Sequence, residues 1–577
     1  AFSDLFIAAD WLPAQQALRF VRTPRLQTET TLQAAHFVAD TQGHVLGLRC
    51  QTDRQLWLGR NHAPGQPLAM LDCVPEVPAT LDTGLDPVAA MGVMLRIAPG
   101  AQACVTFATA ASPDPATLLA IIDKYRQPSY LERASAMSAT LASIQWASHR
   151  PHRDYLPALQ ALTTALVFTL PKVHSTHLGV LTEAQAARPV CDRRTLWQLG
   201  LSGDRPIVLV MAGSPQGMGL LRTLAQALRE WAHGGVACDL VVLSSESHSY
   251  HMPLQRELTL LREHHDADLA THTGPAVTSL RVLRLDELSA AQLGTLASLA
   301  RITLHADGHA LMHQVKAWVA AHGVSMASPW RGGATDEVPT HQGSAQALAP
   351  VGGFAPATGT FGFEVSATLR PAKPWVNVLA NAQLGAMVSE TGAGNTWALN
   401  SRLNQLTAWS NDPVADPPAE WLLLQDRRTR EVWSLTPSAW GAADVVYGVE
   451  HAQGTTTIRH RRGALEVVVR WCVDPITAIK QVFVQVRNLG NRREHLRLVG
   501  MVEWMMGEKR SDRATLATAP CFAPLPDGRL LGLLCTQTEA AAGLGGGTAF
   551  FCEASAGPGT DDRANDSLDW TLSLIHI

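Results

Sequence analysis

The stretch PWVNVLANAQLGAMVSETGAGNTWALNSRLNQLTAWSNDPVADPP, residues 374–418, places three tryptophans among six asparagines, with few charged side chains. Tryptophan and asparagine both need hydrogen-bond partners when they are buried, so this composition is not typical of a surface loop. One interpretation is a sugar site, in which aromatic rings cover the apolar face of a pyranose and amides or carboxylates bind its hydroxyl groups. The other interpretation is a sheet edge, in which asparagine and glycine form turns.

Strands surround this stretch and predict a β-sandwich over residues 361–570. Residues 465–471 and 478–486 alternate apolar and polar side chains, the period of a half-buried strand. The sequence NLGN at 488–491 is a turn signal, and another alternating segment follows it. We therefore expect these strands to pack as two layers around an apolar core.

Residues 1–112 also predict strands, which we interpret as the C-terminal part of a first β-sandwich. Two pairs of apolar segments are each separated by a short turn-type sequence, DTQG in the first pair and APGA in the second. A short turn between two such segments is a hairpin signal. We therefore predict two β-hairpins, one over residues 36–48 and one over residues 93–107.

The middle of the chain changes from helices to alternating strands and helices. Residues 113–189 predict helices, and residues 190–321 predict a small α/β domain. Its first strand, PIVLVMA at 206–212, is continuously apolar, as in a strand of a parallel sheet buried on both faces. Residues 322–360 are rich in glycine, proline, alanine and serine and predict a linker. The predicted fold class is multidomain and mainly β, with two sandwiches separated by helices and a small α/β layer.

The composition indicates a folded protein and excludes several classes. The chain has 577 residues, which is more than one core usually holds, and it is 46% hydrophobic with 17% charged residues. A net charge of −4 gives no electrostatic footprint for nucleic acid. The nine cysteines form no C-x-x-C pair, so we expect free thiols in a reducing compartment. No membrane-spanning apolar run or signal peptide is recognisable.

A glycine-rich segment, MAGSPQGMG at 211–219, lies between a predicted strand and a predicted helix, where phosphate-binding loops are found. Its spacing is not G-x-G-x-x-G, and no G-K-[ST] follows, so we favour a structural turn. A nucleotide site with Glu246 on the ribose stays an alternative. The histidine-rich region near it has no H-E-x-x-H spacing, and no G-x-S-x-G is present, so we expect neither a metal site nor acyl-transfer chemistry.

Several segments together resemble one known family. They are the 374–418 stretch itself, EVWSLTP at 431–437, TDRQLWLGR at 52–60 and LWQLGLSGDRPI at 196–207. These segments are similar to those of cyclic β-1,2-glucan synthases and related phosphorylases of glycoside hydrolase family 94, formerly glycosyltransferase family 36. Trp57 replaces the usual phenylalanine, and Leu201 replaces the usual isoleucine. The resemblance implies that both sandwiches are galactose-mutarotase-like supersandwich domains.

The resemblance also implies what the chain does and does not contain. We expect an internal fragment that precedes the catalytic (α/α)₆ barrel, with no catalytic residue, metal or cofactor of its own. The parent's phosphorolytic module would be inverting, with inorganic phosphate as nucleophile and co-substrate, and would control glucan chain length. The expected partners are a β-glucan oligosaccharide and the downstream barrel of the same chain, without nucleic acid. The expected location is the cytoplasmic side of a bacterial inner membrane.

Six residues of the central stretch are candidates for substrate binding: Trp397, Arg402, Asn404, Trp409, Asn411 and Asp412. They would either border a glucan-binding cleft or brace the sandwich against the barrel. Asp412 and Asp416 each precede a proline, so we predict that both shape turns.

Two other functions stay open at this point. One is a part of a free-standing β-1,2-oligoglucan phosphorylase, which has a similar sandwich. The other belongs to a different class and is a non-catalytic carbohydrate-binding or scaffolding module.

Overall fold

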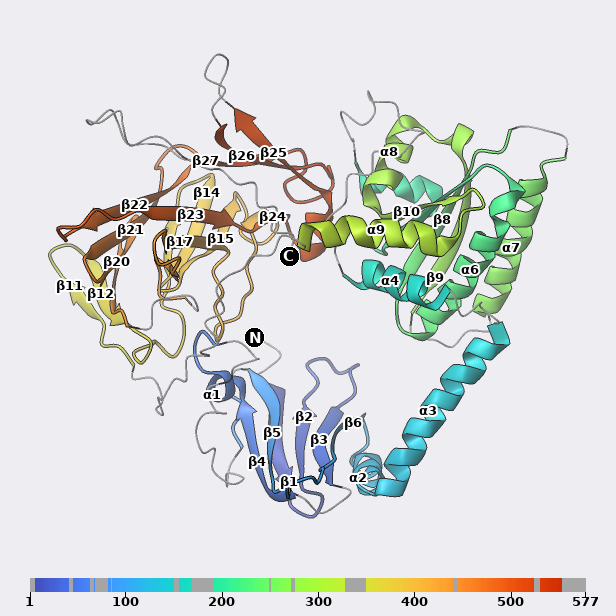
Figure 1. Cartoon of the computed structure of the whole chain (residues 1–577), viewed down its shortest axis with the longest axis horizontal. Coiled ribbons are helices and arrows are strands. Elements are labelled where there is room, and N and C mark those ends of the chain that lie inside the picture. Colours follow the sequence, from blue (N-terminus) through green and yellow to red (C-terminus); the bar gives the residue numbers. More distant parts are fainter. Residues whose placement is uncertain are drawn as a thin grey trace.

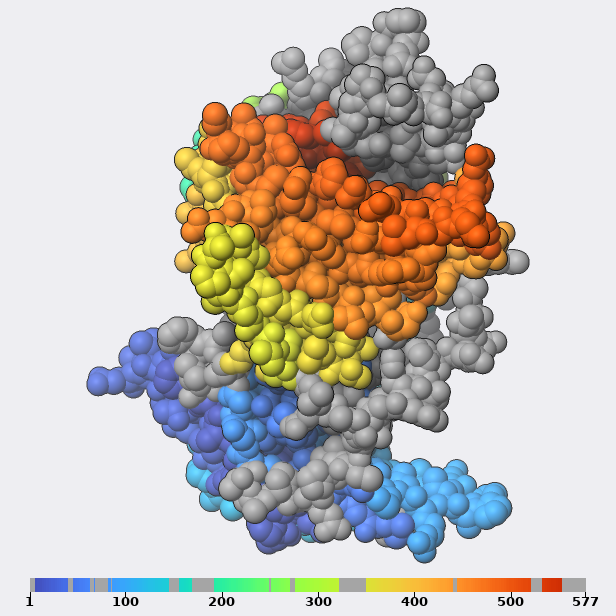
Figure 2. All heavy atoms as spheres, turned by 90° about the vertical axis from the view of Figure 1, so that its left-hand side faces the viewer, coloured from blue at the N-terminus to red at the C-terminus, as the bar shows by residue number. Residues whose placement is uncertain are grey.

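The computed structural model describes residues 6–40, 45–62, 67, 81–84, 86–149, 155–168, 191–247, 251–270, 276–326, 349–438, 444–522 and 530–552. Three groups of elements make up this part of the chain (Figure 1). They are an N-terminal β unit, an α/β layer and a larger β-sandwich. Helix α3 (Pro128–His149) extends from the N-terminal unit toward the α/β layer, and the view in Figure 2 shows the sandwich lying directly against the N-terminal unit.

The N-terminal unit contains a four-stranded antiparallel sheet in the order β1-β2-β3-β6 and a two-stranded sheet of β4 and β5. The strands are β1 (Ile7–Leu12), β2 (Ala17–Arg22), β3 (Leu32–Asp40), β4 (Val45–Asp53), β5 (Pro87–Leu95) and β6 (Val105–Ser112). Helix α2 (Pro115–Tyr125) covers the first sheet, because its Leu118 and Ile122 pack on Ala17 and Phe37. A short helix, α1 (Arg54–Leu58), follows β4.

The two predicted hairpins of this unit are wrong, although their strands exist. β3 pairs with β2 and β6, whereas β4 pairs with β5, so both connections cross between two sheets. The turn at 98–101 does form, with the Ala101 N–H donating to the Ala98 carbonyl, and residues 41–44 lie outside the described part. A turn sequence specifies that the chain reverses. It does not specify whether the returning strand joins the same sheet or the facing one.

The α/β layer is a parallel sheet in the order β10-β7-β8-β9, as its continuous apolar runs predict. The strands are β7 (Ile207–Ala212), β8 (Cys238–Ser244), β9 (Thr278–Arg284) and β10 (Ala300–Ala306). The helices are α4 (Leu156–Val167), η4 (Arg193–Leu199), η5 (Pro215–Gly217), α6 (Met218–His233), α7 (Pro253–Ala270), η6 (Leu285–Glu287), α8 (Ala290–Leu299) and α9 (Leu311–Met326). One face of the sheet packs on α4, α6, α7 and α9, and the other packs on η4 and α8.

The larger sandwich is built from several antiparallel sheets. A six-stranded sheet contains β11 (Gly353–Ala355), β12 (Thr360–Val365), β19 (Tyr447–Ala452), β20 (Thr455–Arg462), β21 (Leu465–Val473) and β22 (Lys480–Asn488) in that order. Facing it is a five-stranded sheet of β13 (Asn377–Ala380), β14 (Leu384–Ser389), β15 (Gly392–Ala398), β16 (Gln405–Thr407) and β24 (Trp504–Gly507). The core between them contains Trp471, Tyr447 and Val388, so the alternation at 465–471 places its apolar side chains as predicted.

Two smaller sheets complete this sandwich. One has the order β18-β17-β23, formed by β17 (Glu420–Asp426), β18 (Val432–Ser434) and β23 (Leu496–Val502). The other is formed by β25 (Leu516–Phe522), β26 (Leu530–Gln537) and β27 (Thr548–Cys552), and the helix η7 (Arg510–Thr515) precedes it. The chain is therefore a mainly β, multidomain protein with a small α/β layer.

The predicted linker at 322–360 is shorter at both ends in the structure. Helix α9 continues to Met326 and β11 begins at Gly353, while residues 327–348 lie outside the described part. The sandwich predicted to residue 570 is described as far as Cys552. In the described helices, none combines the length and the apolarity that crossing a membrane requires.

A buried histidine in the sandwich core gives a pH-dependent prediction. His460 is buried, its Nε2 accepts a hydrogen bond from Trp433 Nε1 (3.4 Å), and burial together with the Arg462 charge lowers its pKa to about 4. The unfolded chain, in which this histidine has a pKa of about 6.5, therefore binds the proton more tightly than the folded chain, and stability falls as the pH drops from about 6.5 toward 4.

Between pH 7 and pH 4.5 this histidine alone should lower the free energy of unfolding by roughly 2 kcal/mol. The change can be measured by urea unfolding followed through tryptophan fluorescence. His460→Gln keeps a hydrogen-bond acceptor but cannot titrate, so the variant should lose this part of the acid sensitivity. Equal acid sensitivity in the variant and the wild type would contradict the assignment.

Candidate functional site

The asparagines of the 374–418 stretch mainly satisfy backbone groups. Asn377 Nδ2 donates to the carbonyls of Ala452 (2.8 Å) and Thr455 (3.0 Å). Asn381 donates to the Asp474 carbonyl and accepts from the Leu384 N–H, and so it links two loops. These amides are structural, as the sheet-edge interpretation predicts for this part of the stretch.

Three of the six candidate residues lie around the turn between β15 and β16. Trp397 is half-buried, and a Cβ atom added at Gly385 would lie 2.3 Å from its ring, so the indole rests on this glycine. The side chain of Arg402 is 86% exposed, and its Nε lies 4.0 Å from Glu508. The Asn404 N–H donates to the Asn400 carbonyl within the turn. Arg402 is therefore the most solvent-accessible of these three side chains.

The other three candidates lie at the opposite end of β16. Trp409 is 43% exposed, and Asn411 is exposed with a φ of 50°, a left-handed conformation that asparagine tolerates. Asp412 accepts hydrogen bonds from the N–H groups of Val414 (3.0 Å) and Ala415 (3.1 Å), which confirms that it shapes a turn. The six candidates thus form two separate groups rather than one continuous cluster along the chain.

Asp412 also binds the N-terminal unit, which the sequence does not reveal. Arg54 of α1 donates to both carboxylate oxygens of Asp412 at 2.8 Å, and to Asp86 at 2.6 Å. Burial opposes ionisation of Asp412, but the hydrogen bonds from Arg54 and the backbone prevail and hold its pKa below the usual range. The carboxylate is therefore ionised and occupied by a guanidinium.

A second junction between the same two units is largely buried. We call Arg60, Arg370, Glu390 and Asp416 the Arg60 cluster. Arg60 donates to Glu390 (2.5 Å) and Asp416 (2.9 Å), and the side chains of Arg60 and Glu390 are 4% and 0% exposed. Asn61 extends the junction, because its N–H donates to the Val414 carbonyl at 2.9 Å.

The members of the Arg60 cluster also form hydrogen bonds with neighbouring hydroxyl, amide and backbone groups. Ser389 Oγ and Thr391 Oγ1 donate to Asp416, and the Trp375 N–H donates to Glu390. Arg370 donates to Asn61 Oδ1 and to the Pro437 carbonyl. Arg60 therefore binds both carboxylates, whereas Arg370 donates to neutral oxygens beside them.

Burial shifts the pKa values of Glu390 and Arg370 in the directions that favour their uncharged forms. It raises the pKa of the Glu390 carboxyl, an effect that the neighbouring Arg60 charge opposes. Burial, together with repulsion from Arg60, lowers the pKa of Arg370 to about 10. Arg370 therefore stays charged at neutral pH.

The sequence contains one local signal of this junction. Arg60 follows the apolar run LWLG and Glu390 follows MVS, and in each case the two residues directly before the charge are buried. A charge in such a position is almost never fully buried without a partner. The identity of the partner could not be read from the sequence, because Arg60 and Glu390 are 330 residues apart.

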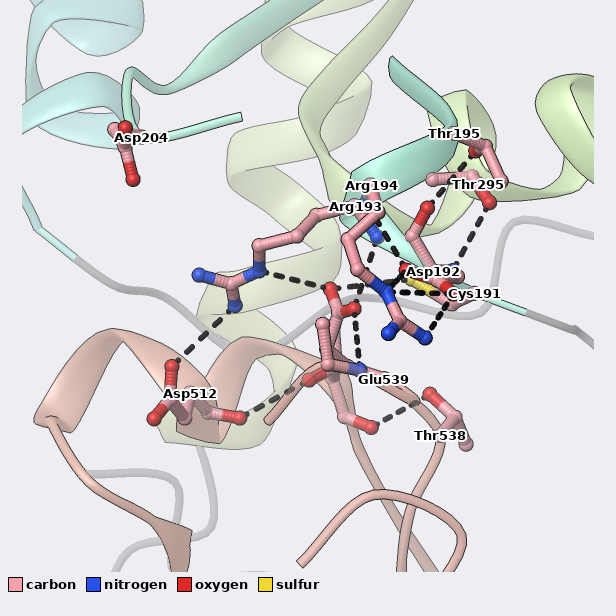
Figure 3. Close-up of polar contacts among 12 residues, drawn as sticks. Cys191, Asp192, Arg193, Arg194, Thr195, Asp204, Thr295, Asp512, Thr538 and Glu539 are labelled. Carbon is pink, nitrogen blue, oxygen red and sulfur yellow. Dashed lines mark hydrogen bonds and ion pairs between the residues drawn. The ribbon is translucent and has the colours of Figure 1, made fainter. Parts of the chain in front are cut away.

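Polar contacts join the α/β layer to the sandwich at Asp512 and Glu539 (Figure 3). Glu539 is fully buried and accepts hydrogen bonds from the Arg193 N–H (2.9 Å), Arg193 Nε (3.3 Å) and Cys191 Sγ (3.7 Å). Arg193 also reaches Asp512 at 3.4 Å, and the Ala540 N–H donates to the Cys191 carbonyl at 2.7 Å. The segment before β7 is therefore held to the sandwich by buried polar contacts.

The glycine-rich loop after β7 is a tightly packed turn. A Cβ atom at Gly217 would lie 2.1 Å from the Ala306 carbonyl oxygen, so only glycine fits between the loop and β10. Glu246 accepts from the N–H groups of Leu254 (2.9 Å) and Gln255 (2.8 Å) at the start of α7, and is occupied as a cap rather than free for a ribose. Within the described residues, no group of three or more His, Cys, Asp or Glu could hold a metal ion.

Comparisons with known proteins agree with this architecture. Residues 1–128 and 362–556 match the family described as glycosyl hydrolase 94, supersandwich domain. Cyclic beta-(1,2)-glucan synthase NdvB of Rhizobium meliloti (strain 1021) is 25% identical over 525 residues, which are 89% of this chain and 18% of that protein. The chain thus spans less than a fifth of that relative's length.

The two matched stretches are the ones that meet in the structure. Arg54 and Arg60 lie in the first, and Asp412, Asp416 and Glu390 lie in the second. Both stretches match the family separately and form one buried interface with each other. The chain belongs to the glycosyl hydrolase 94 supersandwich family.

Proposed function

We propose that this chain is the carbohydrate-binding and structural portion of an enzyme of the cyclic β-1,2-glucan synthase type. The observation that supports it most is the extent of the similarity to NdvB. The 525 aligned residues are more than the two supersandwich stretches together contain, so the α/β layer between them is included. This extent favours a synthase-type parent over a free-standing β-1,2-oligoglucan phosphorylase.

In this proposal the reactive acid belongs to a helical (α/α)₆ barrel downstream in the parent chain. An inverting phosphorylase needs a protonated acid on the leaving oxygen, while phosphate attacks from the opposite face. The acids of the central stretch are committed elsewhere, since Glu390 and Asp416 bind Arg60 and Asp412 binds Arg54. The phosphorolytic module of the parent would use these sandwiches as its scaffold and would control glucan chain length.

The same parent enzyme would determine the ligand, the partners and the location of the chain. A β-glucan oligosaccharide would be the ligand, and inorganic phosphate would be the co-substrate of the parent. The downstream barrel would be a partner domain on the same polypeptide chain. The location would be the cytoplasmic side of a bacterial inner membrane, and the described cysteines, which are free thiols, support a reducing environment.

A catalytic test separates this proposal from an active phosphorylase. The purified chain is incubated with linear β-1,2-glucooligosaccharide and inorganic phosphate, and glucose 1-phosphate is assayed. We expect no product, because no acid of the central stretch is free to act. Release of glucose 1-phosphate by this chain alone would overturn the assignment of the acid to a separate barrel.

Trp409 is the candidate best placed to contact sugar, because its ring is partly exposed beside the exposed Asn411. Trp409→Ala should weaken binding of linear β-1,2-glucooligosaccharide by about tenfold, as expected when an aromatic contact is removed. Isothermal titration calorimetry measures the affinity, and Phe354→Ala, at an exposed aromatic of β11, is the control. Unchanged affinity with a lowered unfolding temperature would instead support bracing.

A further inference from the structure

The 3₁₀ helix η4 presents two planar side chains on one side. In a 3₁₀ helix the residues i and i+3 eclipse each other, about 6 Å apart along the axis. Arg194 and Trp197 have this spacing, and both are exposed, with the Trp197 side chain at 63%. Among tryptophans whose side chains the structure describes, Trp197 is the most exposed.

The exposed indole of Trp197 is held in a fixed orientation. Its neighbours Leu196 and Leu201 are buried in the α/β core, so the backbone on both sides is anchored. Gly200 ends the helix in a left-handed conformation (φ 71°) and turns the chain back, which brings the Ser202 carbonyl to Trp197 Nε1 at 3.2 Å. The polar edge of the ring is thus satisfied by the protein, and its apolar face remains toward solvent.

The guanidinium of Arg194 is fixed as well. Its Nε and Nη2 bind both oxygens of Asp192, with the shortest contact at 2.6 Å (Figure 3). The Asp192 carboxylate also accepts the Arg194 N–H at 3.0 Å. A bidentate pair of this kind sets the plane of the guanidinium and leaves its remaining N–H groups for a ligand.

The opposite side of the same helix is attached to the sandwich. Arg193, the residue between Asp192 and Arg194, binds the buried Glu539 and Asp512. Because Arg193, Leu196 and Leu201 fix the backbone of this segment, the surface loses little conformational entropy when it binds a ligand. The described neighbours of Trp197 include polar groups, because the Ser202 carbonyl binds its Nε1 and the next residue, Gln198, is exposed and accepts a hydrogen bond from Gln292 Nε2 at 3.2 Å.

The geometry points to a second sugar-contact surface formed by Trp197 and Arg194, which takes a linear β-linked glucan chain. The indole face stacks on a pyranose, and the Arg194–Asp192 pair binds hydroxyl groups of the next sugar. The polar surroundings favour a sugar over a protein partner, whose interface would place further apolar side chains around the tryptophan. This inference rests on the proposed function for the identity of the glucan.

The test uses the full chain and linear β-1,2-glucooligosaccharide in isothermal titration calorimetry. Because Trp409 could also bind the ligand, each variant is made with Trp409→Ala already present. In that background Trp197→Ala and Arg194→Ala should each weaken the affinity about tenfold, while Trp197→Phe retains most of it. Arg222→Ala, which removes an exposed ion pair with Glu257 on α7, is the control and should change nothing.

Each outcome decides between the two proposals. If Trp409→Ala alone abolishes binding, or if Trp197→Ala binds like its parent, the Trp197 surface is overturned and the proposed function stands. If the wild-type chain does not bind the glucan, carbohydrate binding by the chain fails together with this surface. A Trp197→Ala variant with a lowered unfolding temperature and unchanged affinity would show a structural role and overturn the inference.

Discussion

Replacing Arg60 with alanine should destabilise the junction between the N-terminal unit and the sandwich by about 3–5 kcal/mol, the usual effect of removing one partner of a buried ion pair. Glu390 is fully buried and Asp416 is largely buried, and both lose the guanidinium that compensates their charge. Burial already raises the pKa of Glu390, so an uncompensated Glu390 would take up a proton or draw in water.

Hydrogen exchange measures this change at the junction itself. The Asn61 N–H, which donates to the Val414 carbonyl, should exchange much faster in Arg60→Ala than in the wild type. Arg492→Ala is a matched control, because Arg492 is exposed and its ion pair with Glu494 lies two residues away, so this variant should leave the Asn61 exchange rate at the wild-type level.

A second change separates loss of charge balance from loss of packing. Adding Glu390→Gln to the Arg60→Ala variant removes one uncompensated carboxylate, and should restore part of the lost protection. If Arg60→Ala behaved like the Arg492→Ala control, the Arg60 cluster would not be what holds the two units together.

Replacing Glu539 with alanine should release the α/β layer from the sandwich and lower the stability of this junction by about 3 kcal/mol. The variant removes the acceptor of the Arg193 N–H and one contact of Cys191 Sγ, and the Arg193 guanidinium keeps its longer contact to Asp512. Glu539→Gln keeps the shape of the side chain and one acceptor oxygen, so this variant should be less destabilised than Glu539→Ala.

The reporter for this junction is the Ala540 N–H, which donates to the Cys191 carbonyl. Its exchange should accelerate in Glu539→Ala, and the segment before β7 should become sensitive to limited proteolysis. Glu257→Ala, at an exposed pair with Arg222, is the control. Protection of Ala540 at the wild-type level in Glu539→Ala would show that the layer is held by other contacts.

Local sequence patterns located most elements of this protein. The apolar run at 206–212 predicted a buried parallel strand, and β7 is buried at every position and pairs in parallel with β8 and β10. The alternation at 465–471 likewise placed Trp471 and Val469 in the core. These patterns succeed because the side-chain period and the burial of a strand are properties of a few consecutive residues.

The same patterns failed where a distant segment decides the outcome. The strands of the two predicted hairpins exist, but β3 and β4 lie in different sheets, as do β5 and β6. The carboxylates of Asp412 and Asp416 were predicted to shape turns, which Asp412 does, yet both are also bound by arginines of the N-terminal unit. Nothing within a few residues of Asp412 specifies Arg54 as its partner.

By itself, the sequence determined the type of each main layer, the family and the presence of a tryptophan- and asparagine-rich segment at the centre. Only the tertiary structure showed that TDRQLWLGR and WSNDPVADPP form one interface, and that the segment DRRTLWQL at 192–199 turns Arg193 inward to Glu539 and leaves Arg194 exposed beside Asp192. The physical reason is that secondary structure follows the local periodicity of burial, whereas the pairing of buried charges depends on which distant segments the folded core brings within hydrogen-bond distance.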